Sequence, residues 1–223
     1  MDKKFCIFDM DGTLLDSMCV WDQLSQRYLD KFGVRLTATD YQALESCTQL
    51  QVAEYFCARY PAITESPVQV MQGMDELICA RYEALAKPRD GARELLRALR
   101  DAGVSMAVAT LTDRKHAEKA LADRGMRDFF DVFLTIDDVG VSKRNPKIYQ
   151  LAAEHMELPP AECMVFEDAP YAGETAKRAG FQVCGIAEPW YAAGETQLRA
   201  VSDLFMEHSF FEVIPAILHE IGK

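Results

Sequence analysis

Residues 3–17 read KKFCIFDMDGTLLDS, and this stretch decides the fold. The apolar residues at 5–8 have the length and composition of a buried strand. Asp9 and Asp11 follow at once, and Gly12 comes directly after them. Two carboxylates held close together raise each other's pKa and cost free energy unless something balances them. The stretch therefore predicts a buried strand that ends in a site in need of a counterion.

Further apolar runs along the chain also indicate buried strands, and helical patterns follow them. The runs lie at 104–110, 163–166 and 181–186, with a weaker candidate at 132–136. The helical patterns lie at 113–124, 147–155 and 172–179. Strands that alternate with helices predict an α/β fold, a doubly wound, Rossmann-like parallel sheet covered on both faces. Ligands in such sheets bind at the carboxyl ends of the strands.

One region breaks this alternation. Between Asp16 and Pro88 lie roughly 70 residues without a strand signal, far too many for a loop. Apolar residues at helical spacing predict helices over 21–32, 50–58 and 71–85. We therefore expect a helical domain at 17–87, inserted into an α/β core domain formed by 1–16 and 88–223.

Composition excludes several classes of partner. The formal net charge is −11, and an acidic chain is a poor partner for nucleic acid or anionic membranes. No apolar run reaches the length of about 18 residues that a membrane span needs. The 7 cysteines are odd in number and form no C-x-x-C pair, so we expect reduced, buried thiols in a cytoplasmic protein. The sequence carries no signal for an oligomeric state.

Each predicted strand ends near a polar residue that a buried strand does not require. These residues are Asp9, Asp11, Thr110, Lys143, Glu167 and Asp168. On an extended chain, side chains two residues apart share a face. One carboxylate of the first pair could therefore attack a group while the other protonates the departing oxygen. Hard oxygen ligands suit Mg²⁺, and a threonine and a lysine suit a phosphoryl group, so the set indicates phosphoryl transfer through an aspartyl phosphate.

Four segments together resemble the motifs of the haloacid dehalogenase superfamily. DMDGTLLDS at 9–17 is similar to its first motif and ATLTD at 109–113 to its second. SKRNPKIY at 142–149 resembles the lysine motif, and VFEDAPYAG at 165–173 the acidic motif. The helical insertion resembles the C1 cap of the β-phosphoglucomutase-like branch. The likeness runs nearly the whole chain, in the right order and spacing.

The resemblance implies roles for the acidic residues. Asp9 would be the nucleophile and Asp11 the general acid and base. Asp9, the backbone carbonyl of Asp11, and Asp168 would hold Mg²⁺. Glu167 would be a further ligand or would support the others.

The resemblance also implies how the phosphoryl group is held. Thr110 and Lys143 would bind its oxygens, with Lys147 the alternative if the loop is aligned differently. Gly12 would let the backbone turn away and approach the phosphate closely.

The sequence departs from the family pattern at several positions. Leu111 follows the threonine of the second motif where serine or asparagine is common, and Arg144 stands where the lysine motif usually has proline. Ala169 replaces a common serine. Trp21 occupies the place of the cap histidine of sugar-phosphate mutases, and no histidine occurs in 17–87. The missing histidine weakens a mutase interpretation and favours water as the final acceptor.

The sequence therefore predicts a Mg²⁺-dependent phosphatase that hydrolyses a small phosphorylated metabolite. A β-phosphoglucomutase-like phosphotransferase is the nearest alternative, and a dehalogenase or a non-catalytic binding protein are more distant ones. Trp21 is expected to pack in the helical domain or to face the substrate. His116 and His155 are expected to be solvated, and Cys6 and Cys163 to be inert apolar residues.

Overall fold

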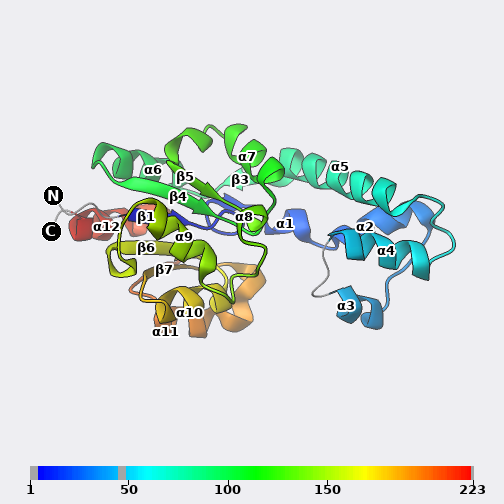
Figure 1. Ribbon diagram of the computed structural model, residues 1–223. Coiled ribbons are helices and arrows are strands. Elements are labelled where there is room, and N and C mark those ends of the chain that lie inside the picture. The colour runs from blue at the N-terminus through cyan, green and yellow to red at the C-terminus, as the bar shows by residue number, and fades with distance from the viewer. Residues whose placement is uncertain (1–4, 45–48, 222–223) are drawn as a thin grey trace. The chain divides into compact units, whose positions relative to one another are not determined.

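The apolar run at the amino terminus forms the central strand of a parallel sheet (Figure 1). The computed structural model describes residues 5–44 and 49–221, and within these the sheet has 6 strands in the order β5-β4-β1-β6-β7-β8. The strands are β1 (Phe5–Phe8), β4 (Ser105–Ala109), β5 (Val132–Leu134), β6 (Cys163–Glu167), β7 (Gln182–Ile186) and β8 (Leu204–Met206). All neighbouring strands run parallel, so the predicted fold class is confirmed.

The strand order places a switch point at β1. The chain adds β4 and β5 on one side of β1, and it adds β6, β7 and β8 on the other. The connecting segments therefore separate at the carboxyl end of β1, where parallel sheets of this kind hold their ligands.

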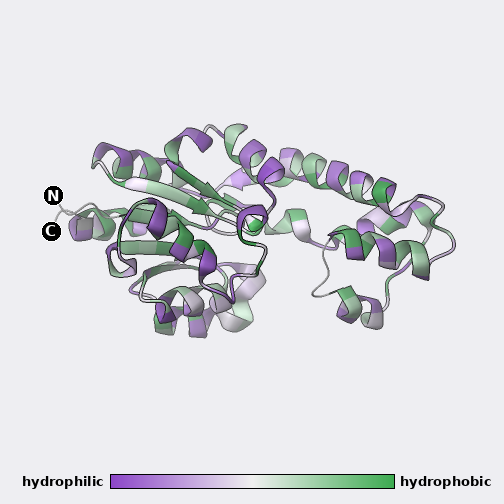
Figure 2. Cartoon of the chain, viewed as in Figure 1, coloured by the Kyte–Doolittle hydropathy of each residue, from purple (hydrophilic) through white to green (hydrophobic). Residues whose placement is uncertain are grey.

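Helices cover both faces of this sheet (Figure 1). They are α6 (Ala92–Asp101), α7 (Arg114–Ala122), α8 (Ile136–Val139), α9 (Lys147–His155), α10 (Pro170–Arg178), α11 (Glu195–Val201) and α12 (Ile214–Ile221). Phe5 and Ile7 share one buried cluster with α9 and α10. Phe8 points to the other face and stacks on Phe166, which in turn meets Phe210. Because both faces are buried, the strands are hydrophobic along most of their length (Figure 2).

The last part of the α/β region carries elements that the sequence patterns did not predict. These are β8, α11 and α12, together with α6 directly after the helical insertion. The predicted strands and helices elsewhere are present, with ends that differ by a few residues.

The chain divides into two compact units. One comprises the described residues up to Met18 together with those from Ala86 onward, and the other is Cys19–Leu85. The predicted domain boundaries, after residues 16 and 87, lie close to these divisions. A two-stranded antiparallel sheet joins β2 (Leu15–Asp16) to β3 (Lys87–Pro88), and it lies at the point where the first unit is interrupted.

The helices from Met18 to Leu85 are short except for the last. They are α1 (Met18–Trp21), α2 (Leu24–Leu29), α3 (Ala38–Leu44), α4 (Gln49–Arg59) and α5 (Pro67–Leu85). The helix predicted over 21–32 is wrong as one continuous element, because Gln23 adopts φ 50° and interrupts it. Trp21 packs edge-on against Tyr82 with ring centroids 6.0 Å apart, as expected for a packing residue of this unit.

A buried carboxylate organises the helical unit. Asp40 Oδ2 accepts hydrogen bonds from the Thr37 amide at 2.7 Å, the Thr37 hydroxyl at 2.6 Å and the Tyr60 hydroxyl at 2.7 Å. Asp40 Oδ1 accepts a fourth bond from the Tyr55 hydroxyl at 2.6 Å. These donors, led by the Thr37 hydroxyl and Tyr55, hold the pKa of Asp40 well below its usual range.

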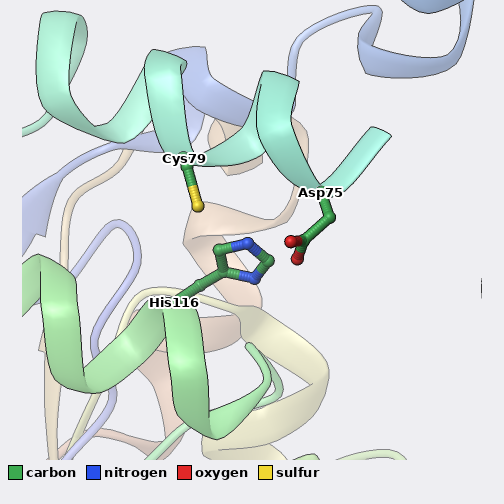
Figure 3. A group of neighbouring side chains, drawn as sticks. All are labelled: Asp75, Cys79 and His116. Carbon is green, nitrogen blue, oxygen red and sulfur yellow. The ribbon is translucent and has the colours of Figure 1, made fainter. Parts of the chain in front are cut away.

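The structure corrects the expectation that His116 is solvated. His116 projects from α7 (Figure 3) and is buried. Its Nδ1 lies 2.5 Å from Asp113 Oδ2. It shares a helix face with the buried Ala120, four residues on. On α5, Asp75 and Cys79 project from successive turns of the helix (Figure 3). His155 is exposed, as predicted.

The described cysteines are free, and half of them fit the prediction of burial. Cys6, Cys163 and Cys184 are buried, and burial raises the pKa of all three thiols, as expected of inert side chains. Cys19 is exposed and Cys57 and Cys79 are half-buried, so the expectation was wrong for these three; Cys47 lies outside the described residues. Within the described residues, no helix combines the length and apolar composition that a membrane span requires.

Candidate active site

Three carboxylates meet at the carboxyl ends of β1 and β6. Asp9 follows β1, Glu167 ends β6, and Asp168 comes next in the chain. One oxygen from each lies within 4.8 Å of the others, and all three side chains are buried. The register explains the meeting, because Phe8 pairs with Phe166 and the Asp9 amide donates to the Phe166 carbonyl at 3.0 Å.

Lys143 supplies a positive charge to this cluster. Its Nζ forms a salt bridge with Asp9 Oδ1 and lies 2.5 Å from Glu167 Oε1. Burial acts to lower the pKa of Lys143, but the two carboxylates outweigh it and hold that pKa well above its usual value. The lysine therefore stays charged. Lys147 Nζ donates instead to the Val139 carbonyl at 2.9 Å, so the structure brings Lys143 rather than Lys147 to the carboxylates.

Two oxygens of the cluster have no hydrogen-bond partner among the described residues. Glu167 Oε1 accepts from Lys143 and from the Tyr149 hydroxyl at 2.6 Å, whereas Oε2 is buried and unpartnered. Asp168 Oδ2 is also buried and unpartnered. Burial, followed by the nearby charge of Asp9, raises the pKa of Asp168 well above its usual range. Burial likewise raises the pKa of Glu167 to about 7.

The two unpartnered oxygens are suited to bind a metal ion. A buried carboxylate oxygen without a donor costs free energy, and a cation would remove that cost. The oxygens are hard ligands, few in number, and close enough to share one ion, which is the donor set that Mg²⁺ takes in proteins. The buried acidic cluster of Asp9, Glu167 and Asp168 could therefore hold a divalent cation.

The hydrogen-bond partners of Asp11 lie outside the carboxylate cluster. Its Oδ1 accepts from the Ser17 hydroxyl at 2.5 Å and its Oδ2 from the Thr112 hydroxyl at 2.6 Å. The expectation that the chain stays extended from Asp9 to Asp11 is wrong. The strand ends at Phe8, and the chain turns between Asp9 and the bridge that Asp11 forms with Leu15.

Gly12 completes this turn. It adopts φ 81°, and a Cβ at this position would collide with Asp168 Oδ2. The residue therefore needs to be glycine for two reasons, the left-handed backbone and the close approach of a carboxylate. Arg89 Nε donates to the Gly12 carbonyl at 2.8 Å, and the same guanidinium forms a salt bridge with Glu188. This pair ties the turn to the segment that follows β7.

Thr110 lies at the end of β4 and is buried. Its hydroxyl accepts from the Thr112 amide at 3.1 Å, which orders the loop between β4 and α7. The sequence reasoning missed Ser17, Thr112, Tyr149 and the Arg89–Glu188 pair as partners of the site. Ser17, Thr112 and Tyr149 fall inside the quoted motif segments, so the motifs carried a signal for them.

The amino-acid sequence matches a known enzyme family. The family model of the haloacid dehalogenase-like hydrolases matches residues 3–180. Validoxylamine A 7′-phosphate phosphatase from Streptomyces hygroscopicus subsp. limoneus is 34% identical over 82% of this chain and 85% of its own length. The phosphorylated carbohydrates phosphatase of Thermotoga maritima is 27% identical over 79% of this chain and 81% of its own length.

Solved structures share the fold over nearly the whole chain. CbbY from Rhodobacter sphaeroides, solved in complex with phosphate, gives a TM-score of 0.76 at 23% identity and covers 95% of this chain and 96% of its own. β-Phosphoglucomutase from Clostridium difficile gives 0.74 at 16% identity, covering 99% and 97%.

The chain belongs to the haloacid dehalogenase-like hydrolase family, so the resemblance seen in its motifs is confirmed. Within that family its curated relatives place it among the phosphoric monoester hydrolases.

Proposed function

We propose that the protein is a Mg²⁺-dependent phosphatase that hydrolyses a small phosphomonoester, such as a sugar phosphate, through an aspartyl-phosphate intermediate. The observation that carries the proposal is the buried meeting of Asp9, Glu167 and Asp168 around Lys143, with two carboxylate oxygens left unpartnered. Most buried polar atoms are hydrogen-bonded, so two unpartnered carboxylate oxygens in one cluster support a ligand-binding role.

The first half-reaction needs a nucleophile and an acid. A carboxylate oxygen of Asp9 attacks phosphorus, and the bond from phosphorus to the leaving oxygen breaks. Asp11 gives its proton to that oxygen, so the product leaves as an alcohol. Ser17 and Thr112 support this role, because they orient the Asp11 carboxyl from both of its oxygens.

The second half-reaction returns the enzyme to its starting state. Asp11, now ionised, takes a proton from water while the water oxygen attacks phosphorus. The bond to Asp9 breaks, inorganic phosphate forms, and Asp11 is again protonated. Lys143 would stay charged throughout and neutralise the phosphoryl oxygens, a role supported by its raised pKa and its ion pair with Asp9. Thr110 accepts from Thr112, so its own hydroxyl hydrogen can be donated to the same group.

Asp9, Asp168, Glu167 and the backbone carbonyl of Asp11 would hold Mg²⁺ in this scheme. The ion, when bound, supplies charge that offsets the carboxylates and the substrate phosphate. The residues at 17–87 are proposed as the cap, whose side chains select the leaving group.

Phosphate release from a panel of sugar phosphates, with p-nitrophenyl phosphate as a general substrate, tests the proposal. Asp9→Asn should lower kcat by about 10³-fold or more while the melting curve stays cooperative, because the substitution nearly preserves shape. Chelation of divalent ions should stop wild-type turnover, and added Mg²⁺ should restore it. Hydrolysis retained by Asp9→Asn would refute the nucleophile assignment, and indifference to the chelator would refute the metal requirement.

A second assay separates hydrolysis from phosphoryl transfer. Glucose 1-phosphate, supplied with a bisphosphate primer, would be converted to glucose 6-phosphate by a mutase and would release inorganic phosphate with a phosphatase. The absence of any histidine in 17–87 supports water as the acceptor.

A further inference from the structure

Arg144 occupies a place at the site that the proposed mechanism leaves without a role. It follows Lys143 directly, in the loop that enters α9. Its guanidinium carbon lies over the ring of Tyr171, 4.6 Å from the ring centroid. Tyr171 in turn lies three residues after Asp168, in the first turn of α10. Arg144 and Tyr171 therefore each lie within three residues along the chain of a side chain in or beside the cluster, and they contact each other.

The charge of Arg144 is not committed to a carboxylate. Arg144 is exposed, and within 5–44 and 49–221 no acidic group lies at ion-pair distance from its guanidinium. Other cations near the site are already paired, Lys143 with Asp9 and Glu167, and Arg89 with Glu188.

The ring under Arg144 lies within electrostatic reach of the cluster. Burial raises the pKa of the Tyr171 hydroxyl, and the negative charge of Glu167 raises it further. Tyr191 behaves in the same way, with burial first and then Tyr171 and Asp168 as the causes of its raised pKa. Tyr171 and Tyr191 are therefore close enough to the carboxylates for their charge to act on both hydroxyls, and the Arg144 guanidinium lies over the Tyr171 ring.

We propose that Arg144, seated on Tyr171, binds a second anionic group of the substrate, so that the enzyme prefers phosphomonoesters carrying another phosphate or a carboxylate. This inference rests on the proposed function. A guanidinium stacked on an aromatic ring keeps its N–H donors free along its edge, where they match an anionic fork in a bidentate manner. A neutral leaving group would make no use of this cation.

Matched substrate pairs test the proposal and distinguish the two anions. Fructose 1,6-bisphosphate against fructose 6-phosphate probes a second phosphate, and 2-phosphoglycolate against 2-hydroxyethyl phosphate probes a carboxylate. We expect the wild type to favour the doubly anionic member of at least one pair in kcat/KM, and Arg144→Ala to reduce that preference about tenfold, mainly through KM. An unchanged preference in Arg144→Ala, or no preference in the wild type for either pair, would overturn the inference.

Control variants exclude a general effect of charge or of folding. Arg178→Ala removes one positive charge from the far end of α10 and should leave the preference intact. Tyr171→Phe keeps the ring and should behave like the wild type. Tyr171→Leu removes the aromatic ring under the Arg144 guanidinium and should lose part of the substrate preference. If Arg178→Ala lowers the preference as much as Arg144→Ala does, the effect is one of net charge and the inference fails.

Hydrolysis of p-nitrophenyl phosphate separates this outcome from a failure of the proposed function. That substrate has no second anion, so Arg144→Ala should change its turnover by less than about twofold. Loss of this activity in Asp9→Asn, together with an unchanged substrate preference in Arg144→Ala, would leave the phosphatase proposal standing and remove only the role of Arg144.

Discussion

Two buried aspartates, one in each unit, differ in their hydrogen bonding. Asp40 of the helical unit receives four hydrogen bonds, from Thr37, Tyr55 and Tyr60, and they reach both of its oxygens. Asp168 of the α/β unit is equally hidden from solvent, yet its Oδ2 has no partner within the described part of the chain. Hydrogen bonds therefore offset the free-energy cost of burying the Asp40 carboxylate, whereas one oxygen of Asp168 is buried without such compensation.

We propose that this difference separates a structural carboxylate, Asp40, from one that binds a ligand, Asp168. The donors around Asp40 come from the helices and loops they hold together, so its charge stabilises the local fold. Asp168 lies close to Asp9 and Glu167, where repulsion and desolvation oppose its ionisation. Such a group destabilises the protein until a cation arrives, and that cost is the sign of a binding site.

Among the substitutions that test this comparison, Asp168→Asn should lower activity the most, second only to replacement of the proposed nucleophile Asp9. Activity should fall by about 100-fold or more, because a charged ligand for the cation is lost. In the absence of divalent ions the same variant should melt several degrees above the wild type, because one of three crowded carboxylates becomes neutral. Phosphate release and thermal melts with and without Mg²⁺ measure the two effects.

The matched control for this prediction is Asp203→Asn. Asp203 is a more exposed carboxylate of the same unit that pairs with Lys177. It should leave both activity and the response to Mg²⁺ unchanged. A destabilised Asp168→Asn variant that still responds to Mg²⁺ like the wild type would show that Asp168 is structural, as Asp40 is.

Asp40→Asn should lower the melting temperature at neutral pH by several degrees, since four donors lose a charged acceptor. The pKa of Asp40 is depressed in the folded state, so its contribution is present above a pH of about 4 and is lost as the pH falls below that. The gap between the wild type and Asp40→Asn should therefore narrow on acidification. Circular dichroism melts between neutral and acidic pH measure the gap.

An exposed pair in the same unit provides the control for Asp40. Asp22 pairs with Arg27 at the surface, so Asp22→Asn should change the melting temperature little at any pH. A constant gap between the wild type and Asp40→Asn across the pH range would contradict the assignment of Asp40 as an ionised structural group.

Tyr149→Phe should have the smallest effect of the series. The hydroxyl lost is one of two donors to Glu167 Oε1, so the melting temperature should fall by roughly 2–4 °C. Burial raises the pKa of Glu167 to about 7, and the Tyr149 hydroxyl acts to lower it. Without that hydroxyl the pKa of Glu167 rises further, so the acidic limb of the pH–rate profile should move to higher pH.

A surface tyrosine controls for this last substitution. Tyr41→Phe alters a hydroxyl on an exposed side chain and should leave the pH–rate profile unchanged. An acidic limb of Tyr149→Phe that coincides with that of the wild type would mean that Glu167 does not titrate in the catalytic cycle.

Much of the α/β unit was predictable because its strands are buried on both faces. Such strands appear as plain apolar runs, and the site residues follow their ends directly, as Asp9 and Asp168 do. β8 was not predictable by the same means, since its 3 residues, Leu204–Met206, lie directly between the acidic residues Asp203 and Glu207 and form no longer apolar run.

The helical unit and the partners of the site were harder to predict for a different reason. The break at Gln23 depends on a left-handed backbone at a residue that usually avoids it, and no apolar spacing announces such a break. The donors to Asp11 come from Ser17 and from Thr112, which lies about one hundred residues away along the chain. Hydroxyl contacts of this kind depend on tertiary placement, which periodicity does not record.

The short pairing of β2 with β3 bears on how such a chain can diversify. Leu15 pairs with Pro88, so the inserted segment leaves the α/β unit and returns to it at the same point. An insertion whose two ends adjoin can be exchanged for a longer, shorter or unrelated one without rethreading the sheet. With the inserted unit acting as the proposed cap, evolution can change the substrate while the reaction chemistry is inherited intact, and a protein engineer can insert a different substrate-binding module between β2 and β3.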